Sequence, residues 1–336
     1  MGGNTLDYSL LDTPEYTKRQ RRYNDIEEVK QFIYQLVAND IVGDFYIKDT
    51  MDTLNNLQRG KGVDTEGEIE KFGEAMKDLM RKEFSPSVPN YNGRSGLRMS
   101  SIGKPLRQQW FGLNKYSKEK IDSKTLIKFM YGHVIEEMLL LFVRLSGHAV
   151  TDEQKLCNVG GIKGSMDCKI DGVVVDVKST TKFGITKFEN GSLAADDSFG
   201  YIDQIKAYAH SEGERKWAWL AMDRDSGKLA VCQYDLDDTE HPYHSHFSQD
   251  IEERVEEVKK HTGGEDMPEQ CSFPVEDGKS GNLKLSTMCG YCPYKKHCYP
   301  TLKVYATGSG PKFLTHVVKR PKYKSGAVCP EIDLNF

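Results

Sequence analysis

The sequence predicts an α/β protein whose central sheet is flanked by helices, and three stretches of the chain predict this. A long helical pattern covers 123–146, and a strand-rich region with one helix among its strands covers 149–235. A charged helical pattern follows near 249–261. Strands and helices in this order are typical of an α/β core.

The length and composition indicate an ordinary soluble chain. Its 336 residues suffice for one large domain with additions or for two domains. Its apolar runs are shorter than the roughly 20 residues of a membrane span, and its first residues lack a secretory-signal pattern. Gly2 invites a myristoylation site, but Leu6 stands where that motif needs Ser or Thr. We expect no membrane contact and a cytoplasmic location, which is the host cytoplasm if a phage encodes the protein.

Residues 1–95 are expected to form a helical accessory region. Apolar residues recur at helical spacing in two places, which are Ile26, Val29, Ile33 and Leu36, and Ile69, Phe72, Met76 and Leu79. A stretch rich in Pro, Ser, Asn and Gly at 84–96 then marks a boundary.

Residues 96–262 are expected to form the core. Its first helix, over 123–146, has Asp122 or Ser123 as N-cap and Gly147 just past its end. A short β-branched strand covers 173–177, and a helix includes 204–210. Two strands over 217–222 and 229–234 enclose a turn at 225–227, and the charged helix that follows ends at Gly263.

Residues 263–336 are expected to form a cysteine-cluster segment and a basic C-terminal tail. Four of the eight cysteines fall in one short stretch of this segment: Cys271, Cys289, Cys292 and Cys298. In a reducing compartment such a group favours metal or redox chemistry over disulfides. The net charge of −4 argues against a simple basic nucleic-acid coat, yet no acidic residue occurs between Cys298 and Glu331. The basic residues of that stretch are Lys303, Lys312, Lys319, Arg320, Lys322 and Lys324.

A predicted hairpin brings two carboxylates together. If Asp171-Gly172 forms a two-residue turn, counting back along both strands sets Asp167 directly opposite Asp176. Their Cβ atoms would be about 5 Å apart on one face of the sheet. Side chains two apart on a strand share a face, so Lys178 joins them.

This trio suits a metal-dependent hydrolase of phosphodiester bonds. Two facing carboxylates repel unless a cation lies between them, and hard oxygen ligands favour Mg²⁺ or Mn²⁺. Lys178 can hold or activate the attacking water and offset charge on a phosphate. The alternative is an exposed cross-strand ion pair on an ordinary hairpin, since a bare D-x8-D-x-K pattern is common.

Flanking residues add to the trio. Glu136 shares a helix face with Leu140 and Val143, and a carboxylate among apolar neighbours needs a partner, which a metal ion would supply. Glu137 is the competing candidate. Downstream, Gln204 and Tyr208 lie four apart on one helix face, where both could reach the same phosphate or metal-bound water.

Taken in order, Gly132-x3-Glu136, Asp167, Asp176-x-Lys178 and Gln204-x3-Tyr208 resemble the RecB-like branch of the PD-(D/E)XK nuclease superfamily. That branch includes lambda exonuclease-like enzymes and the CRISPR-associated adaptation exonucleases, and the resemblance covers roughly 130–300. It implies a restriction-endonuclease-like core with a mixed central sheet, Mg²⁺ or Mn²⁺, and cleavage of DNA. It also implies that Glu136, Asp167 and Asp176 are metal ligands, that Lys178 is the catalytic lysine, and that Gln204 and Tyr208 support them.

The resemblance extends to the cysteines. Many RecB-like relatives close the nuclease domain with the same C-x2-C-x5-C as Cys289, Cys292 and Cys298, and bind a 4Fe-4S cluster through one further cysteine of an upstream motif. The segment 100–107 resembles that motif but has no cysteine. Cys271 is the best substitute, and Cys157 and Cys329 are weaker candidates. Soft thiolates also bind zinc, so Zn²⁺ is the alternative to the cluster.

The favoured function is a DNA exonuclease in phage-type recombination, replication or DNA degradation. A structure-specific endonuclease on the same core is one alternative, and a non-catalytic DNA-binding or assembly protein is another. We expect single- or double-stranded DNA as partner, with contacts from Arg107, Lys319, Arg320 and Lys322, and a recombination or replication protein as a second partner.

Overall fold

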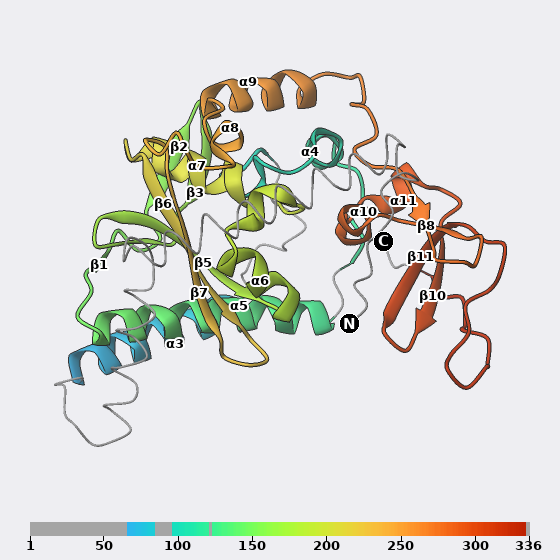
Figure 1. The fold of residues 1–336 in the computed structure, drawn as a ribbon, viewed down its shortest axis with the longest axis horizontal. Coiled ribbons are helices and arrows are strands. Elements are labelled where there is room, and N and C mark those ends of the chain that lie inside the picture. Colours follow the sequence, from blue (N-terminus) through green and yellow to red (C-terminus); the bar gives the residue numbers. More distant parts are fainter. Residues whose placement is uncertain (1–65, 85–95, 121–122, 334–336) are drawn as a thin grey trace, which may run out of the picture.

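The computed structural model describes residues 66–84, 96–120 and 123–333 (Figure 1). The predicted helical pattern at 26–36 and most of the predicted boundary at 84–96 lie outside these ranges. The second N-terminal pattern forms helix α3, Glu66–Phe84, which packs along α5.

The described core is built on a mixed sheet of five strands, in the order β1-β4-β5-β6-β7. β5 and β6 are parallel, whereas the other neighbours in the sheet are antiparallel. The strands are β1 Val150–Thr151, β4 Cys168–Ile170, β5 Val173–Thr180, β6 Lys216–Asp223 and β7 Leu229–Asp235. With helices on both faces, this arrangement confirms the predicted α/β class.

The two faces of the sheet follow from alternation along its strands. On β5, Val174 lies in the core that contains residues of α6, α7 and α9, while Val175 and Val177 lie in the core under α5. β6 alternates in the same way, with Trp217 and Trp219 toward α7. Because side chains on a strand alternate between faces, even-numbered positions of β5 face α7.

The predicted helices of the core are present. They are α5 Ser123–Leu145, α7 Tyr201–Ser211 and α9 Ile251–Thr262, and the further described helices are α4 Leu106–Leu113, α6 Lys182–Glu189, α8 His244–Phe247, α10 Thr287–Tyr291 and α11 Lys295–Cys298. Short 3-10 turns cover Met99–Ser101 (η3) and Ser192–Ala195 (η4). Gly147 follows α5 with φ of 90°, a conformation open to glycine, and Asp250 caps α9 by accepting the Glu252 N–H at 2.8 Å.

The turn at Asp171-Gly172 has the predicted geometry. Asp171 and Gly172 have φ of 49° and 86°, as a two-residue hairpin turn with both central residues left-handed requires. Ile170 pairs with Val173, and the pairing continues to Cys168 and Val175. The register count that set Asp167 beside Asp176 therefore starts from the correct pair.

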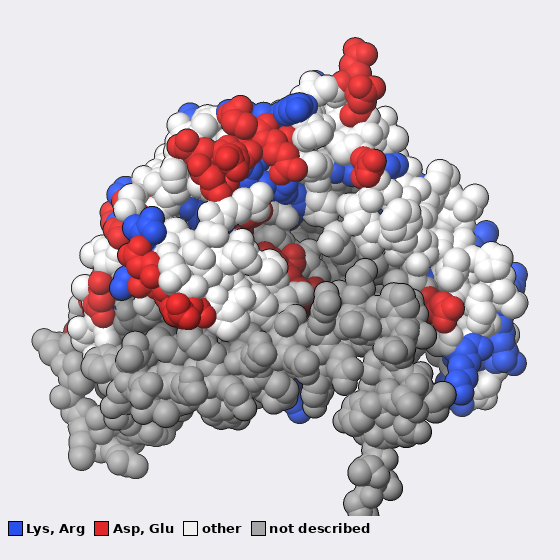
Figure 2. All heavy atoms as spheres, turned by 45° about the horizontal axis from the view of Figure 1, so that its top comes forward, with Lys and Arg blue, Asp and Glu red and all other residues white. Residues whose placement is uncertain are grey.

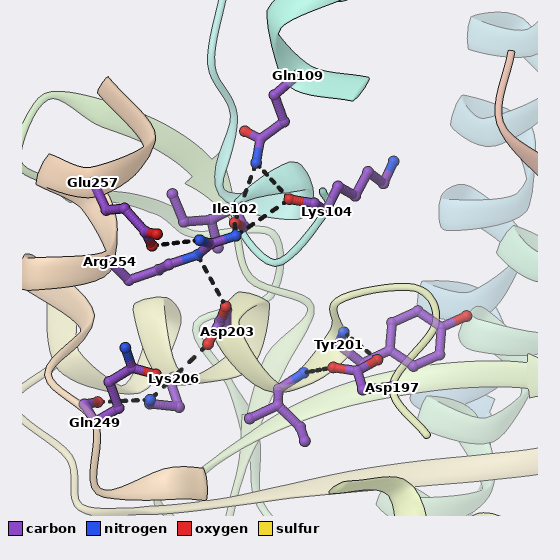
Figure 3. A network of polar contacts seen from close by, with 11 residues as sticks. Ile102, Lys104, Gln109, Asp197, Tyr201, Asp203, Lys206, Gln249, Arg254 and Glu257 are labelled. Atoms are coloured by element: carbon purple, nitrogen blue, oxygen red, sulfur yellow. Dashed lines mark hydrogen bonds and ion pairs between the residues drawn. The ribbon is translucent and has the colours of Figure 1, made fainter. Parts of the chain in front are cut away.

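A close backbone contact and the partly buried Arg254 join α7 to the upstream segment that holds η3. A Cβ on Gly103 would lie 2.5 Å from the Gly200 carbonyl oxygen, so the two backbones touch where α7 begins. Arg254 of α9 donates to the carbonyls of Ile102 and Lys104 at 3.2 Å each, and forms an ion pair with Asp203 of α7 at 3.3 Å (Figure 3). These contacts fix the start of α7 relative to the rest of the core.

The C-terminal segment forms its own small sheet, in the order β10-β11-β9-β8. Its strands are β8 Val275–Glu276, β9 Leu283–Lys284, β10 Lys303–Thr307 and β11 Gly310–His316. The sequence described the stretch after Cys298 as a tail, but its first part is the β10–β11 hairpin. A separate hairpin, β2 Leu156–Val159 with β3 Ile162–Ser165, lies between β1 and β4 in the chain. Among the described helices, none is both long and apolar enough to cross a membrane.

Candidate active site

Asp176 and Lys178 lie on the α7 face of β5, as their spacing predicted. Asp176 is 1% exposed, and its Oδ2 lies 2.5 Å from the Lys178 ammonium nitrogen. Burial raises the pKa of Asp176, and Lys178 opposes this shift. Burial acts to lower the pKa of Lys178, but Asp176 and Asp167 outweigh it and hold that pKa above its ordinary value. An ion pair between a buried aspartate and a partly buried lysine therefore forms the centre of the site.

Asp167 lies one residue before β4 and reaches the same place. Its Oδ2 accepts the Val177 N–H at 2.7 Å, which ties it to β5 next to Asp176. Burial raises the pKa of the Asp167 carboxyl to about 7, and the nearby Asp176 adds to the shift. The predicted closeness of the two aspartates is thus present, with Asp167 held by a main-chain donor.

Glu136, rather than Glu137, lies near the aspartates. Burial raises the pKa of Glu136 to about 9, and the negative charge of Asp167 is the second largest cause of that shift. The pKa of Glu137 is raised by burial and by Glu153, and Asp176 is not among its causes. Of the two candidates that the sequence left open, the structure brings Glu136 to the site.

Gln204 and Tyr208 act from α7. The Gln204 side-chain amide donates to Asp176 Oδ1 at 3.2 Å. Tyr208 is 2% exposed and its hydroxyl is hydrogen-bonded to Gln204. Tyr208 is therefore a positioning residue, because it reaches Asp176 only through Gln204.

The carboxylates and the lysine do not balance in charge. When ionised, Glu136, Asp167 and Asp176 carry three negative charges, against the single cation of Lys178. Buried like charges favour proton uptake or a bound cation, and this oxygen donor set suits Mg²⁺ or Mn²⁺. As the described side chains stand, no group of three His, Cys, Asp or Glu residues has a metal-holding arrangement. The donors thus fit a divalent cation in kind and charge, and the binding itself is a proposal.

Two site residues were missed by the sequence reasoning. The Lys178 ammonium lies 4.8 Å from the centre of the Tyr201 ring, within range of a cation–π contact. Gln154 donates to Glu136 Oε1 at 2.8 Å. Tyr201 precedes Gln204 by three residues on α7, so the helical spacing could have indicated it, whereas Gln154 is in a loop and gave no local signal.

The four C-terminal cysteines lie close enough to influence one another. Cys271 is hydrogen-bonded to Cys289, which lowers the pKa of the Cys289 thiol to about 6. Burial raises the pKa of Cys292 to about 11, and Cys298 and Cys289 add to this shift. Burial also raises the pKa of Cys298. Thiols gathered in this way fit a thiophilic metal or cluster in kind.

The other cysteine candidates lie elsewhere. Cys157 is a buried residue of strand β2 and belongs to the main core, and Cys329 is packed with Tyr305 and Leu314. Arg107, expected to contact DNA, donates to the Pro268 carbonyl at 3.1 Å and is hydrogen-bonded to Cys298. The motif at 100–107 thus reaches the cysteines through Arg107.

The predicted basic residues Lys319, Arg320 and Lys322 are exposed after β11. Lys303 and Lys312, by contrast, form ion pairs with Glu331 at 2.7 Å and Asp277 at 3.0 Å. Figure 2 shows acidic atoms gathered over α9 and basic atoms at the outer end of the C-terminal sheet.

Of the known proteins compared with this chain, only solved structures are similar to it. No protein-family model and no curated protein matches the chain. An alkaline exonuclease from Laribacter hongkongensis matches at 12% identity and a TM-score of 0.34, over 50% of this chain and 89% of that one. Its complex with dAMP matches at 10% identity and 0.33, over the same shares. A phage-related exonuclease from Haemophilus somnus 129PT matches at 16% identity and 0.36, over 52% of this chain and 96% of that one. The side-chain arrangement described above therefore carries the functional argument by itself.

Proposed function

We propose that this protein is a metal-dependent deoxyribonuclease of the PD-(D/E)XK type that hydrolyses phosphodiester bonds from a DNA end. One observation carries the proposal: the buried Asp176 forms an ion pair with the partly buried Lys178 on one strand face, with the Asp167 carboxylate beside them. A folded protein has little reason to bury such a set unless it serves chemistry, since buried charge is costly.

Each residue has a distinct role in this proposal. Asp176, Asp167 and Glu136 would hold Mg²⁺ or Mn²⁺, which when bound polarises the phosphate and lowers the pKa of water. Lys178 would orient the attacking water and offset charge that develops on the phosphate oxygens. Gln204 keeps the Asp176 carboxylate in one orientation through the 3.2 Å hydrogen bond, and Tyr208 holds Gln204.

The cysteines suggest a structural role beside the catalytic one. We propose that Cys271, Cys289, Cys292 and Cys298 hold a 4Fe-4S cluster, with Zn²⁺ as the alternative, that fixes the C-terminal segment to the nuclease core. The hydrogen bond between Cys271 and Cys289 supports Cys271 as the fourth ligand. Phage-type recombination, replication or DNA degradation, alone or with a partner protein, is the setting that we propose.

An assay that compares linear with covalently closed circular DNA of the same sequence distinguishes exonuclease from endonuclease activity. With Mg²⁺ or Mn²⁺, the purified protein is expected to degrade the linear form and leave the circle intact. Nicking or linearisation of the circle would instead assign an endonuclease. Asp176→Asn, assayed in parallel, is the control for a contaminating nuclease, and an inactive wild-type protein on both forms would leave the non-catalytic DNA-binding role.

A further inference from the structure

Three aromatic rings lead from the catalytic lysine toward the cysteine segment. Tyr201, whose ring lies under the Lys178 ammonium, is stacked on Phe199 with ring centres 5.5 Å apart and planes 24° apart. Phe199 meets Tyr291 edge-on, with ring centres 5.6 Å apart. We call Tyr201, Phe199 and Tyr291 the aromatic row.

The outer rings of this row are largely open to solvent. Phe199 is 42% exposed and Tyr291 is 72% exposed, so their packing against each other leaves ring surface uncovered. Neither ring belongs to the buried clusters of the described residues. Exposed rings next to a catalytic group indicate a binding surface, because core packing does not account for them.

Cations lie beside the outer end of the row. Lys104 follows Gly103, whose backbone touches that of Gly200 between Phe199 and Tyr201. Lys118 and Arg98 lie near enough to lower the pKa of Lys104, after the larger effect of burial. Cys292, the residue after Tyr291, is near the same lysine. In Figure 3 the Lys104 ammonium points away from the Arg254 network. Cations that tolerate such closeness are suited to an anionic ligand.

We propose that the aromatic row stacks the unpaired bases of a DNA strand, so that the site takes its substrate as single-stranded DNA. The row offers ring faces, the cations beside it meet phosphates, and Lys178 lies at its inner end. Bases within a duplex already stack on their neighbours and leave no face for Phe199 or Tyr291, whereas unpaired bases stack readily on aromatic side chains. The inference rests on the proposed nuclease function and names its substrate.

The test compares two strands that differ only in their bases. One is a single-stranded oligonucleotide, and the other is an abasic strand of equal length with the same phosphates. Binding is measured in EDTA, so that no cleavage occurs. Tyr291→Leu and Phe199→Leu are each expected to weaken binding of the base-containing strand by about 5- to 150-fold and to leave the abasic strand unchanged.

Phe84→Leu is the matched control, because Phe84 lies on α3 and is 71% exposed, much like Tyr291. It is expected to bind both strands as the wild type does. Equal losses on both strands, or no loss on the base-containing strand, would overturn the inference. A 2-aminopurine base in the strand gives an independent readout, because its fluorescence should change on binding to the wild type and not to Tyr291→Leu.

Failure of the inference and failure of the proposed function give different results. A protein that cuts DNA but binds the two strands alike lacks the aromatic contact and keeps the nuclease function. A protein that prefers the base-containing strand through Tyr291 but cuts nothing keeps the binding surface and loses the nuclease assignment.

Discussion

Each carboxylate oxygen of Asp176 has its own partner: Oδ1 accepts from the Gln204 amide, and Oδ2 pairs with the Lys178 ammonium. Asp176→Asn keeps the shape of the side chain and removes its charge, and Lys178→Ala removes the cation. Each is expected to lower DNA cleavage under Mg²⁺ at least about 100-fold while the protein stays folded, because metal and charge stabilisation supply several kcal/mol. The measurement is single-turnover cleavage of linear DNA, with circular dichroism as the control for folding. Wild-type rates in either variant would contradict the assignment.

Raised carboxyl pKa values predict how stability depends on pH. The pKa of Asp167 rises from 3.8 to about 7 and that of Glu136 from 4.5 to about 9, so the folded state binds these protons more tightly than the unfolded one. Their contribution to stability is complete below about pH 4 and is lost as pH rises toward about 9. In EDTA the melting temperature should therefore fall over this range, by roughly 2–4 °C for each kcal/mol lost.

A divalent cation is expected to reverse this loss. Mn²⁺ or Mg²⁺ should raise the melting temperature more at high pH than at low pH, because the ligands must lose their protons to bind it. The double variant Glu136→Gln, Asp167→Asn is the control and should respond weakly to both pH and metal. A metal effect that is equal in the control and the wild type would show that binding occurs elsewhere.

Much of the candidate site was predictable because its central part is local. The turn at Asp171-Gly172 and the alternation of β5 place Asp167, Asp176 and Lys178 without knowledge of the rest of the fold. The choice between Glu136 and Glu137 was not predictable, since it depends on how α5 is rotated against the sheet. The Gln154 contact comes from a loop and depends on tertiary structure alone.

At the scale of elements, long periodic segments were predicted well and short strands were not. The strands over 216–223 and 229–235 and helices α5, α7 and α9 follow their sequence patterns. The two-residue strands β1, β8 and β9 have no room for an alternating pattern, and β1 and β9 also pair with the distant strands β4 and β11. The β10–β11 hairpin was not predicted, because its basic residues suggested a solvated tail. In the structure Lys303 and Lys312 form ion pairs with Glu331 and Asp277, which lie outside the hairpin.

The cysteine segment has small helices that are too short to be stable alone, so a bound cluster should hold it together. Protein purified without oxygen is expected to be brown and to contain about four irons per chain. Cys271→Ser should lose iron, whereas Cys329→Ser, which changes a buried cysteine outside the group, should keep it. Stoichiometric zinc without iron would replace the cluster by a zinc site, and full metal in Cys271→Ser would exclude Cys271.

At the scale of the molecule, the exposed basic residues after β11 predict salt-dependent DNA binding without sequence preference. Reversal of Lys319, Arg320 and Lys322 together should weaken binding of unrelated DNA sequences and reduce the salt slope by up to about 3, since each phosphate contact contributes about 0.9. The matched control reverses Lys77, Arg81 and Lys82, three basic residues of α3. Equal effects of the two triple variants would assign the loss to net charge rather than to a binding surface.

The parallel pairing of β5 and β6 has a consequence for how the site comes into being. Parallel neighbours need a long crossover, and here the crossover runs over 181–215 and carries α7 with Gln204 and Tyr208. The β4–β5 hairpin brings Asp167 and Asp176 together through contacts that are local in sequence, but Gln204 arrives only when this loop closes. Closure of non-local contacts is slow relative to hairpin formation. During folding the Asp167–Asp176 pair is therefore expected to come together before α7 docks beside it, and the candidate site is complete only when β6 has joined the sheet.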